Sequence, residues 1–164
     1  MKQVKPIFLP KIKTNKNKTV AVSGHRNLSY GINKDIVEKT FLSLIERGFD
    51  TFLVGMAIGF DTLCFNILSE LRNKYDIKII ACIPCLDQSL KFSESSKTEY
   101  TEMLKISDDK VLISLNYTKN CMLDRNVYMV NNSSVLVAYI RENKGGTYFT
   151  VNYAKNENKE IIFV

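Results

Sequence analysis

The chain has 164 residues, of which 45% are hydrophobic and 24% are charged, proportions that fit one folded domain with one hydrophobic core. Apolar runs stay far below the about 20 residues that a membrane-spanning helix needs, and the N-terminus lacks the apolar core of a secretory signal, so we expect a cytoplasmic protein without a membrane span. The formal net charge of +6 is unevenly distributed: six lysines and no acidic residue lie in residues 1–18, which leaves 17 basic and 17 acidic residues for positions 19–164.

This uneven charge divides the chain into a basic N-terminal extension, residues 1–18, and a single folded domain, residues 19–164. Nucleic-acid-binding domains usually carry their excess positive charge on the fold itself. Because the folded part is neutral, we do not expect nucleic acid as a partner. We interpret the extension as a solubilising segment or an additional edge strand, and the alternative is an arm that binds a polyanion.

The predicted elements of the first half begin with a strand over residues 19–23. Apolar side chains at helical spacing then predict a helix over residues 34–47. A strand over residues 50–54 and a helix over residues 62–75 follow. Residues 77–83 are apolar at almost every position, which is typical of a strand buried on both faces.

The second half continues the alternation of helices and strands. Helices are predicted over residues 93–106, 122–131 and 147–155, and strands over residues 110–114, 135–140 and 161–164. This pattern predicts the α/β class, as a Rossmann-like three-layer αβα sandwich with a mainly parallel sheet and helices on both faces.

Four segments rich in glycine, arginine and hydroxyl groups follow the carboxyl ends of predicted strands. They are residues 23–26, 55–61, 124–126 and 145–147. In an open parallel sheet, ligands bind beyond these ends, near a switch in strand order. A glycine loop that leads directly into a helix presents backbone N–H groups to an anion, usually a phosphate. The four segments together therefore predict one phosphate-binding pocket.

Within these segments, glycines and arginines suit a phosphate group. Gly24, Gly55 and Gly59 remove side chains that would block the approach of a phosphate to backbone N–H groups. Arg26 and Arg125 are able to bind phosphate oxygens through two parallel hydrogen bonds. The alternative role for Arg125 is an ion pair with a local acidic side chain.

Other side chains of the same segments suit the remainder of a nucleotide. Asp61 and Asn126 are candidates for accepting or donating hydrogen bonds to ribose hydroxyls, and Phe60 and Met129 are candidates for packing on a base. The alternatives are that Asp61 caps the following helix, that Phe60 and Met129 belong to the core, and that residues 145–146 form only a tight turn.

Groups suited to acid–base or metal chemistry are few. His25, Asp61 and Asp87 are the candidates for a general acid or base near the loops, and a structural role is the alternative for His25. Residues 82–85 have CxxC spacing, but they end an apolar run rather than open a helix, and the other two cysteines are single. We therefore expect no metal site, no redox function and no cofactor.

In five places the sequence resembles the YpsA-type branch of the SLOG superfamily, at residues 22–26, 54–61, 82–88, 125–129 and 145–147. The resemblance covers about residues 19–164, and it implies a Rossmann-like fold that binds nucleotides or nucleotide-derived ligands. The residues that it implies around the pocket are Gly24, Arg26, Gly55, Asp61, Gln88, Arg125, Asn126, Gly146 and Thr147.

Two related groups provide contrasts. The LOG-type phosphoribohydrolases of the superfamily carry a glutamate three residues after the glycine–threonine turn, where this chain has Thr150, so the resemblance argues against cleavage of an N-glycosidic bond. The DNA-processing protein DprA has similar loops and binds single-stranded DNA, for which we expect clustered Lys and Arg that the neutral fold lacks.

We therefore expect a protein that binds, and so senses or sequesters, a small nucleotide-derived ligand such as an ADP-ribose-like or cyclic signalling nucleotide. The alternatives are a hydrolase of a nucleotide glycosidic or phosphate bond, DprA-like binding of single-stranded DNA, and a protein-interaction module. A homo-oligomer is compatible with the sequence. The expected ligand-binding residues are Gly24, His25, Arg26, Gly55, Met56, Ala57, Gly59, Phe60, Asp61, Gln88, Arg125, Asn126, Met129, Gly145, Gly146 and Thr147.

Overall fold

A computed structural model describes all 164 residues, and strands and helices alternate along it from residue 19 onward. The strands are β1 (Thr19–Gly24), β2 (Thr51–Val54), β3 (Lys78–Cys85), β4 (Asp109–Ser114), β5 (Val135–Tyr139) and β6 (Glu160–Phe163). The helices are α1 (Lys34–Glu46), α2 (Phe60–Leu71), α3 (Glu94–Ile106), α4 (Cys121–Asn131) and α5 (Gly145–Asn156), and a single 3₁₀ turn, Lys16–Lys18, precedes β1.

The six strands form one sheet in the order β4-β3-β2-β1-β5-β6, and every neighbouring pair is parallel. The chain moves outward from β1 to β4 and then returns to the other side of β1 to form β5 and β6. The order of the strands therefore reverses between β1 and β5. In sheets of this kind the crevice at such a reversal is where ligands bind.

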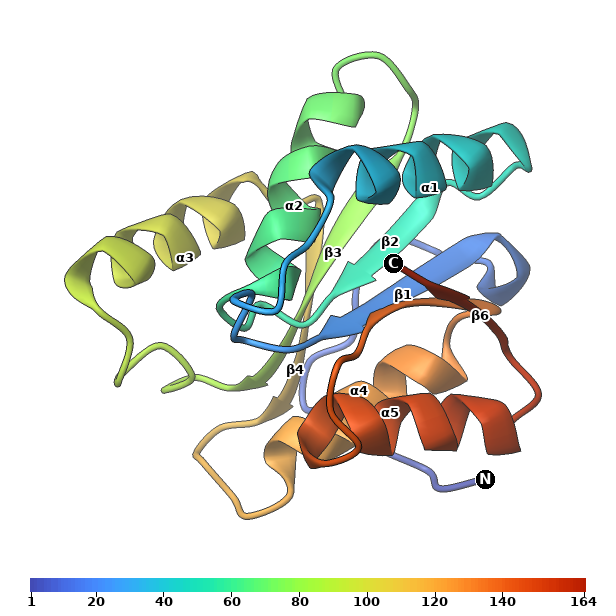
Figure 1. Ribbon diagram of the computed structural model, residues 1–164. Helices are drawn as coiled ribbons and strands as arrows, with labels where there is room; N and C mark the ends of the chain where they lie inside the picture. Colours follow the sequence, from blue (N-terminus) through green and yellow to red (C-terminus); the bar gives the residue numbers. More distant parts are fainter.

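Helices cover both faces of the sheet (Figure 1): α1, α2 and α3 lie on one face, and α4 and α5 lie on the other. The alternation of side chains along each strand supplies both cores, because Val20 and Val22 belong to a cluster of 24 buried residues under the first three helices, whereas Ala21 belongs to a cluster of 13 under the other two. This arrangement confirms the predicted Rossmann-like three-layer sandwich.

Among the boundaries that differ from the sequence prediction, three lie at the carboxyl edge of the sheet, near the strand ends that the sequence singled out. Helix α2 begins at Phe60, directly after Gly59, whose φ of 81° suits only glycine at that bend. Helix α5 begins at Gly145 rather than two residues later. Strand β3 continues through Pro84 to Cys85, whereas we expected a loop to begin at this proline.

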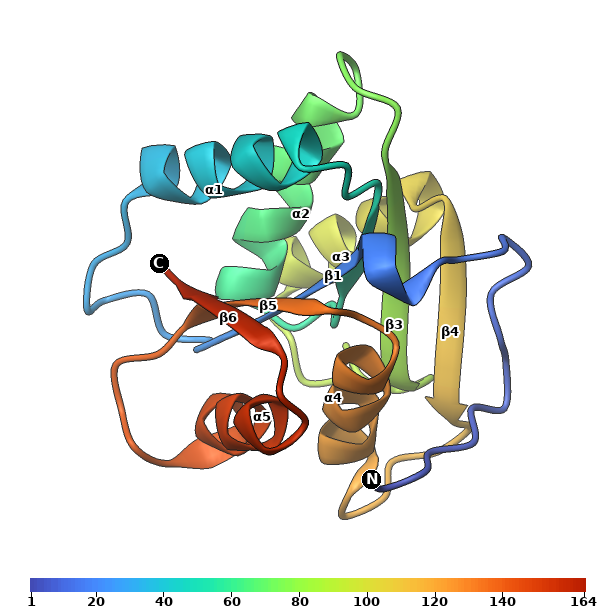
Figure 2. The ribbon, with the colours of Figure 1, turned by 90° about the vertical axis from the view of Figure 1, so that its right-hand side faces the viewer.

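The N-terminal extension lies along the outer edge of the sheet (Figure 2). The Ile7 and Phe8 backbone N–H groups donate to the Leu112 carbonyl at 2.8 and 3.1 Å, and the Leu112 N–H donates to Phe8 at 3.0 Å. Val4 packs against the smaller core, and Lys2 forms an ion pair with a residue of α4. This short antiparallel pairing protects β4 from edge-to-edge association. None of the helices has the length and apolar character that crossing a membrane requires.

Candidate functional site

A cavity of about 560 Å³ opens where the carboxyl ends of β1 and β5 diverge. Its volume lies in the range of about 300–1,000 Å³ that small-molecule sites occupy. We call it the switch-point cavity. Its lining residues are Val22, Ser23, Gly24, His25, Arg26, Ala57, Asp61, Met122, Leu123, Arg125, Asn126, Glu142, Lys144, Gly145, Gly146 and Thr147. All four segments that the sequence singled out therefore contribute to one cavity.

Asp61 provides the most unusual polar group of this cavity. It lies in the first turn of α2 with 6% of its surface exposed. Its Oδ2 atom accepts a hydrogen bond from the Ala57 N–H at 3.2 Å, whereas its buried Oδ1 atom has no hydrogen-bond partner. A buried oxygen without a partner costs about 1–3 kcal/mol. A hydrogen-bond donor on a ligand in the cavity would remove this cost.

The ionisation of Asp61 is also perturbed. Burial raises the pKa of Asp61 to about 6, and the nearby positive charge of Arg125, the Ala57 N–H and Arg26 limit the increase. The carboxyl group accepts hydrogen bonds when it is ionised and donates one when it is protonated. Its protonation therefore changes close to physiological pH.

Arg125 connects α4 to the ends of two strands. It is 5% exposed, and its Nη1 atom donates to the Gly55 carbonyl and, at 3.4 Å, to the Cys82 carbonyl. Its Nε atom donates to Asn126 Oδ1 at 2.7 Å. A β-carbon on Gly55 would lie 2.8 Å from Arg125 Cζ and 2.9 Å from Asp61 Oδ2. The guanidinium group is thus fixed by carbonyl oxygens, and Asp61 lies on the same side of Gly55, because one added β-carbon would meet both side chains.

The glycines that follow β1 and β2 serve contacts within the protein. A β-carbon on Gly24 would overlap the ring of Phe60, and one on Gly59 would overlap the backbone of Arg26. Gly55 faces side chains in the same way. We predicted that these three glycines admit a phosphate. In the structure, Gly24 and Gly59 permit the close approach of the first and second loops, and Gly55 makes room for Arg125 and Asp61.

The N-terminal turn of α5, in contrast, faces open space. Nothing lies within 4 Å of the position of a β-carbon on Gly145, and the nearest atom to one on Gly146 is Asn126 Nδ2 at 3.9 Å. The N-caps of α5 and α4 make no side-chain hydrogen bond. In α4 the Cys121 N–H donates to the Thr118 carbonyl at 3.3 Å. The first turn of α5 and the positive ends of both helices are able to face an anion. Arg26 and Lys144, both exposed, line the same cavity, where Lys144 also forms an ion pair with Glu142 at 3.7 Å.

His25 holds loops together. Its Nε2 atom accepts hydrogen bonds from the backbone N–H groups of Arg141 at 2.7 Å and Glu142 at 3.2 Å. Its backbone carbonyl accepts the Phe60 N–H at 3.2 Å. These bonds assign the ring proton to Nδ1 and occupy the lone pair that a general base needs. The geometry supports the structural role that we gave as the alternative for His25.

Six of the expected ligand-binding residues lie outside the walls of the switch-point cavity: Gly55, Met56, Gly59, Phe60, Gln88 and Met129. Met56, Phe60 and Met129 are 2% exposed or less and belong to the two cores. Gln88 donates to the Gly55 carbonyl at 3.1 Å, so it stabilises the loop without lining the switch-point cavity. Asp87 lines a neighbouring cavity.

Four lining residues lie outside the segments that the sequence singled out: Met122, Leu123, Glu142 and Lys144. Lys144 directly precedes the glycine turn, and a basic residue before a helix N-terminus is a signal that would have identified it. Met122 and Leu123 lie one turn before Arg125 and Asn126 on α4. No local pattern identifies Glu142, whose carboxylate accepts a hydrogen bond from the Tyr30 hydroxyl.

Two structures of DNA processing protein A are similar to this fold. The chain matches DprA from Streptococcus pneumoniae with a TM-score of 0.65 and 22% identity, over 90% of this chain and 50% of that chain. It matches DNA processing protein A from Helicobacter pylori with a TM-score of 0.63 and 18% identity, over 90% of this chain and 65% of that chain. The chain thus spans about half to two thirds of these proteins, and the likeness shows the shared fold.

This likeness corrects one expectation. The Helicobacter pylori structure describes a mode of single-stranded DNA binding, so our argument that this kind of domain does not take nucleic acid as a partner is wrong. The charge of residues 19–164 is balanced, but a net charge does not report where the charges lie. Arg26, Arg125 and Lys144 all line one cavity, although the domain as a whole is neutral.

Sequence relatives include two UPF0398 proteins of Listeria monocytogenes. One, lmo1889 of serovar 1/2a, is 22% identical over 156 residues, which are 87% of this chain and 86% of that protein. The other, from serotype 4a, is 24% identical over 107 residues, or 59% of each chain. The model of the YspA SLOG family matches residues 15–163, almost the whole folded part. With its parallel six-stranded sheet and its glycine-bounded loops at the strand ends, this chain belongs to the YspA SLOG family.

Proposed function

We propose that the protein binds a small nucleotide-derived ligand in the switch-point cavity, and that it acts as a sensor or sequestering protein for a ligand such as an ADP-ribose-like or cyclic signalling nucleotide. A phosphate group faces the first turn of α5 and the side chains of Arg26 and Lys144. A ribose hydroxyl donates to Asp61. The membership of the SLOG family supports a nucleotide as the class of ligand.

The observation that carries the proposal is the buried Oδ1 atom of Asp61, which has no partner and belongs to a residue of the cavity wall. It lacks a hydrogen-bond donor, while Arg26, Lys144 and the N-terminus of α5 around it favour an anion. A ribose phosphate supplies both groups a few ångströms apart. Inorganic phosphate supplies only the anion.

Calorimetric titration with AMP, ADP-ribose and cyclic nucleotides tests this proposal. We expect a dissociation constant of micromolar or lower for at least one of them, and a tenfold or greater weakening, about 1.4 kcal/mol or more, for Arg26→Ala. The matched control is Arg47→Ala, because Arg47 is also exposed but pairs with Glu160 at the far end of the sheet. A folded protein that releases no heat with any nucleotide of the panel contradicts the proposal.

Hydrolysis of the bound nucleotide is a second candidate function, favoured by the raised pKa of Asp61 inside the cavity. A carboxyl group with a pKa near 6 is suited to proton transfer at neutral pH. Chromatography of nucleotides after incubation with the protein tests this candidate. Product that forms with the wild type and disappears with Asp61→Asn supports it, and unchanged nucleotides between pH 5 and 8 count against it.

Single-stranded DNA is a third candidate ligand, favoured by the fold shared with DNA processing protein A. The same cationic groups, Arg26 and Lys144, would then face the phosphates of a strand. Fluorescence anisotropy with a labelled oligonucleotide measures this binding directly. A steep loss of affinity with added salt is expected of a strand that contacts several phosphates.

A further inference from the structure

A second cavity, of about 640 Å³, adjoins the switch-point cavity. Arg26 and Met122 line both, so the two spaces meet at these side chains. We call the second space the outer cavity. Besides these two residues, it is lined by Ile58, Cys85, Asp87, Gln88, Leu90, Lys91, Phe92, Ser93, Ser96 and Tyr117. It lies beyond the carboxyl ends of β3 and β4, two strands further along the same edge of the sheet.

The outer cavity differs from its neighbour in chemistry. Two aromatic side chains line it, Phe92 after β3 and Tyr117 after β4. Tyr117 is 64% exposed, and the flanking Leu90 is 67% exposed. Exposed aromatic and apolar side chains around a cavity are typical of ligand-binding sites. Phe92, in contrast, is held by an edge-on contact with Tyr100, with ring centres 5.8 Å apart.

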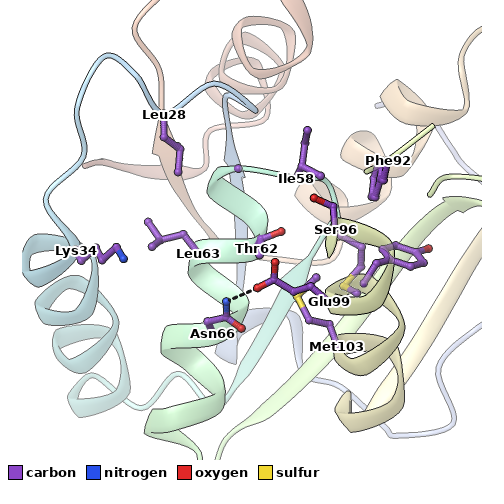
Figure 3. A pocket seen from close by; sticks show the side chains of 13 residues that line it. Leu28, Lys34, Ile58, Thr62, Leu63, Asn66, Phe92, Ser96, Glu99 and Met103 are labelled. Carbon is purple, nitrogen blue, oxygen red and sulfur yellow. Dashed lines mark hydrogen bonds between the residues drawn. The ribbon is translucent and has the colours of Figure 1, made fainter. Parts of the chain in front are cut away.

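A smaller recess on the other side of Phe92 is too limited for the same use (Figure 3). It measures about 250 Å³ and lies between α2 and α3. Ile58, Phe92 and Ser96 separate it from the outer cavity, and a hydrogen bond of 3.0 Å between Asn66 and Glu99 spans the two helices. Phe92 therefore forms part of the wall between the recess and the outer cavity.

Positively charged side chains lie along the path from the switch-point cavity to the outer cavity. Arg26 is exposed and lines both of them, and Lys91 adds a second cation in the outer cavity. From one cavity to the other, the path passes a helix N-terminus, then Arg26, then aromatic side chains. These groups suit, in the same order, the phosphate of a first nucleotide, a linking phosphate and a second base.

We propose that the ligand is a dinucleotide whose two nucleosides are joined through phosphate. One nucleotide occupies the switch-point cavity, the linking phosphate lies beside Arg26, and the second base stacks in the outer cavity on the exposed ring of Tyr117. This inference rests on the proposed function, because it extends the same site from one nucleotide to two.

The test compares the dissociation constants of mononucleotides and dinucleotides measured by calorimetry. The probes are AMP and GMP, the linear dinucleotides pApA and pGpG, and the corresponding cyclic dinucleotides. We expect at least one dinucleotide to bind tenfold or more tightly than either mononucleotide, because stacking of one base on an aromatic side chain commonly contributes about tenfold or more. Tyr117→Ala is expected to remove this advantage and to leave the mononucleotide affinity unchanged.

The control variant is Tyr75→Ala, because Tyr75 is exposed but follows α2 at the opposite end of the sheet. Since Tyr117 is exposed, its replacement is not expected to disturb folding, and Lys91→Ala provides a second variant in the same cavity. Dinucleotides that bind no tighter than mononucleotides, or a Tyr117→Ala variant that keeps the dinucleotide advantage, overturn the inference while the proposed function stands.

Two further outcomes are decisive. If no nucleotide binds at all, the proposed function fails and the dinucleotide inference fails with it. A twelve-residue oligoadenylate, as RNA and as DNA, is titrated alongside. If the affinity increases markedly from pApA to the twelve-residue strand, the two cavities bind a polynucleotide. This result overturns the inference that the ligand is a dinucleotide.

Discussion

At the scale of single residues, the site depends on side chains that occupy the space left free by a glycine. Asp61 and Arg125 both border the position of a β-carbon on Gly55, and neither is more than 6% exposed. Both are therefore fixed by the protein before any ligand arrives. Gly145 and Gly146, in contrast, border open space and line the cavity. Glycines of the same site thus have two distinct purposes, packing and access for a ligand.

This distinction predicts opposite effects of two alanine substitutions. Gly55→Ala is expected to destabilise the protein by about 1–3 kcal/mol, because the new methyl group displaces two buried side chains. Gly146→Ala is expected to leave stability unchanged or to raise it by up to about 1 kcal/mol, while it weakens nucleotide binding. Urea unfolding and calorimetry of both variants measure these effects. Equal stabilities of the two variants would contradict the packing argument.

The pKa of Asp61 predicts how stability changes with pH. The folded-state value of about 6 exceeds the ordinary value of 3.8. Below pH 4 both states bind the proton and Asp61 imposes no penalty, whereas between pH 4 and 6 only the folded state retains it. The free energy of unfolding therefore decreases as pH rises through this window, by about 3 kcal/mol in total, and stays low above it.

Asp61→Asn removes this titration. We expect the difference in unfolding free energy between the variant and the wild type to shift in favour of the variant by about 3 kcal/mol from pH 4 to pH 7. Asp76→Asn is the control, because its side chain is 99% exposed. Urea unfolding at several pH values gives the comparison, and a difference that stays constant across the window would show that Asp61 titrates normally.

At the scale of elements, the extension and the site lie at separate places on the sheet. Residues 7 and 8 pair with the edge strand β4, while the switch-point cavity lies between β1 and β5. The contacts of the extension, such as Lys2 with Asp124, involve the side of α4 that lines a different cavity. The extension therefore protects an edge of the sheet, and its lysines are exposed.

Deletion of residues 1–9 is expected to lower stability by about 1–2 kcal/mol, because it removes the burial of Val4 and three backbone hydrogen bonds. It is also expected to increase aggregation, because β4 becomes a free edge. Light scattering and nucleotide titration check both effects, and nucleotide affinity should remain unchanged. The control replaces Lys5, Lys11 and Lys13 with glutamine, which keeps the pairing and removes charge; a loss of ligand affinity in this control would favour the polyanion-binding arm.

At the scale of the whole molecule, the switch-point cavity joins the two helical layers. Asp61 belongs to α2 on one face of the sheet, and the N-terminal turns of α4 and α5 come from the other face. A ligand that contacts all three helices links the two helical layers. Binding should therefore stabilise both layers together.

Hydrogen exchange measured by mass spectrometry tests this link. With a nucleotide at one hundred times its dissociation constant, we expect stabilisation of about 2.7 kcal/mol and slower exchange in the first turns of α2, α4 and α5. The C-terminal halves of α1 and α3, remote from the cavity, serve as internal controls. Protection confined to one layer would show that the ligand does not bridge the sheet.

The sequence by itself determined the order and type of the elements and the segments at the strand ends. Apolar spacing depends on neighbours within one helix or strand, so the boundaries agree to within a few residues, and 10 of the 16 expected ligand-binding residues line the switch-point cavity. The differences at α2, α5 and Pro84 arise where glycine geometry or pairing with β4 extends an element.

Only the tertiary structure decided which residues meet. The position of β5 beside β1 creates the cavity, and no local pattern encodes the order of strands in a sheet. The same contacts between distant segments place Phe60 and Met129 in the cores, engage the lone pair of His25, and leave one oxygen of Asp61 without a partner. These properties depend on distances between residues far apart in the chain, which spacing along the sequence does not specify.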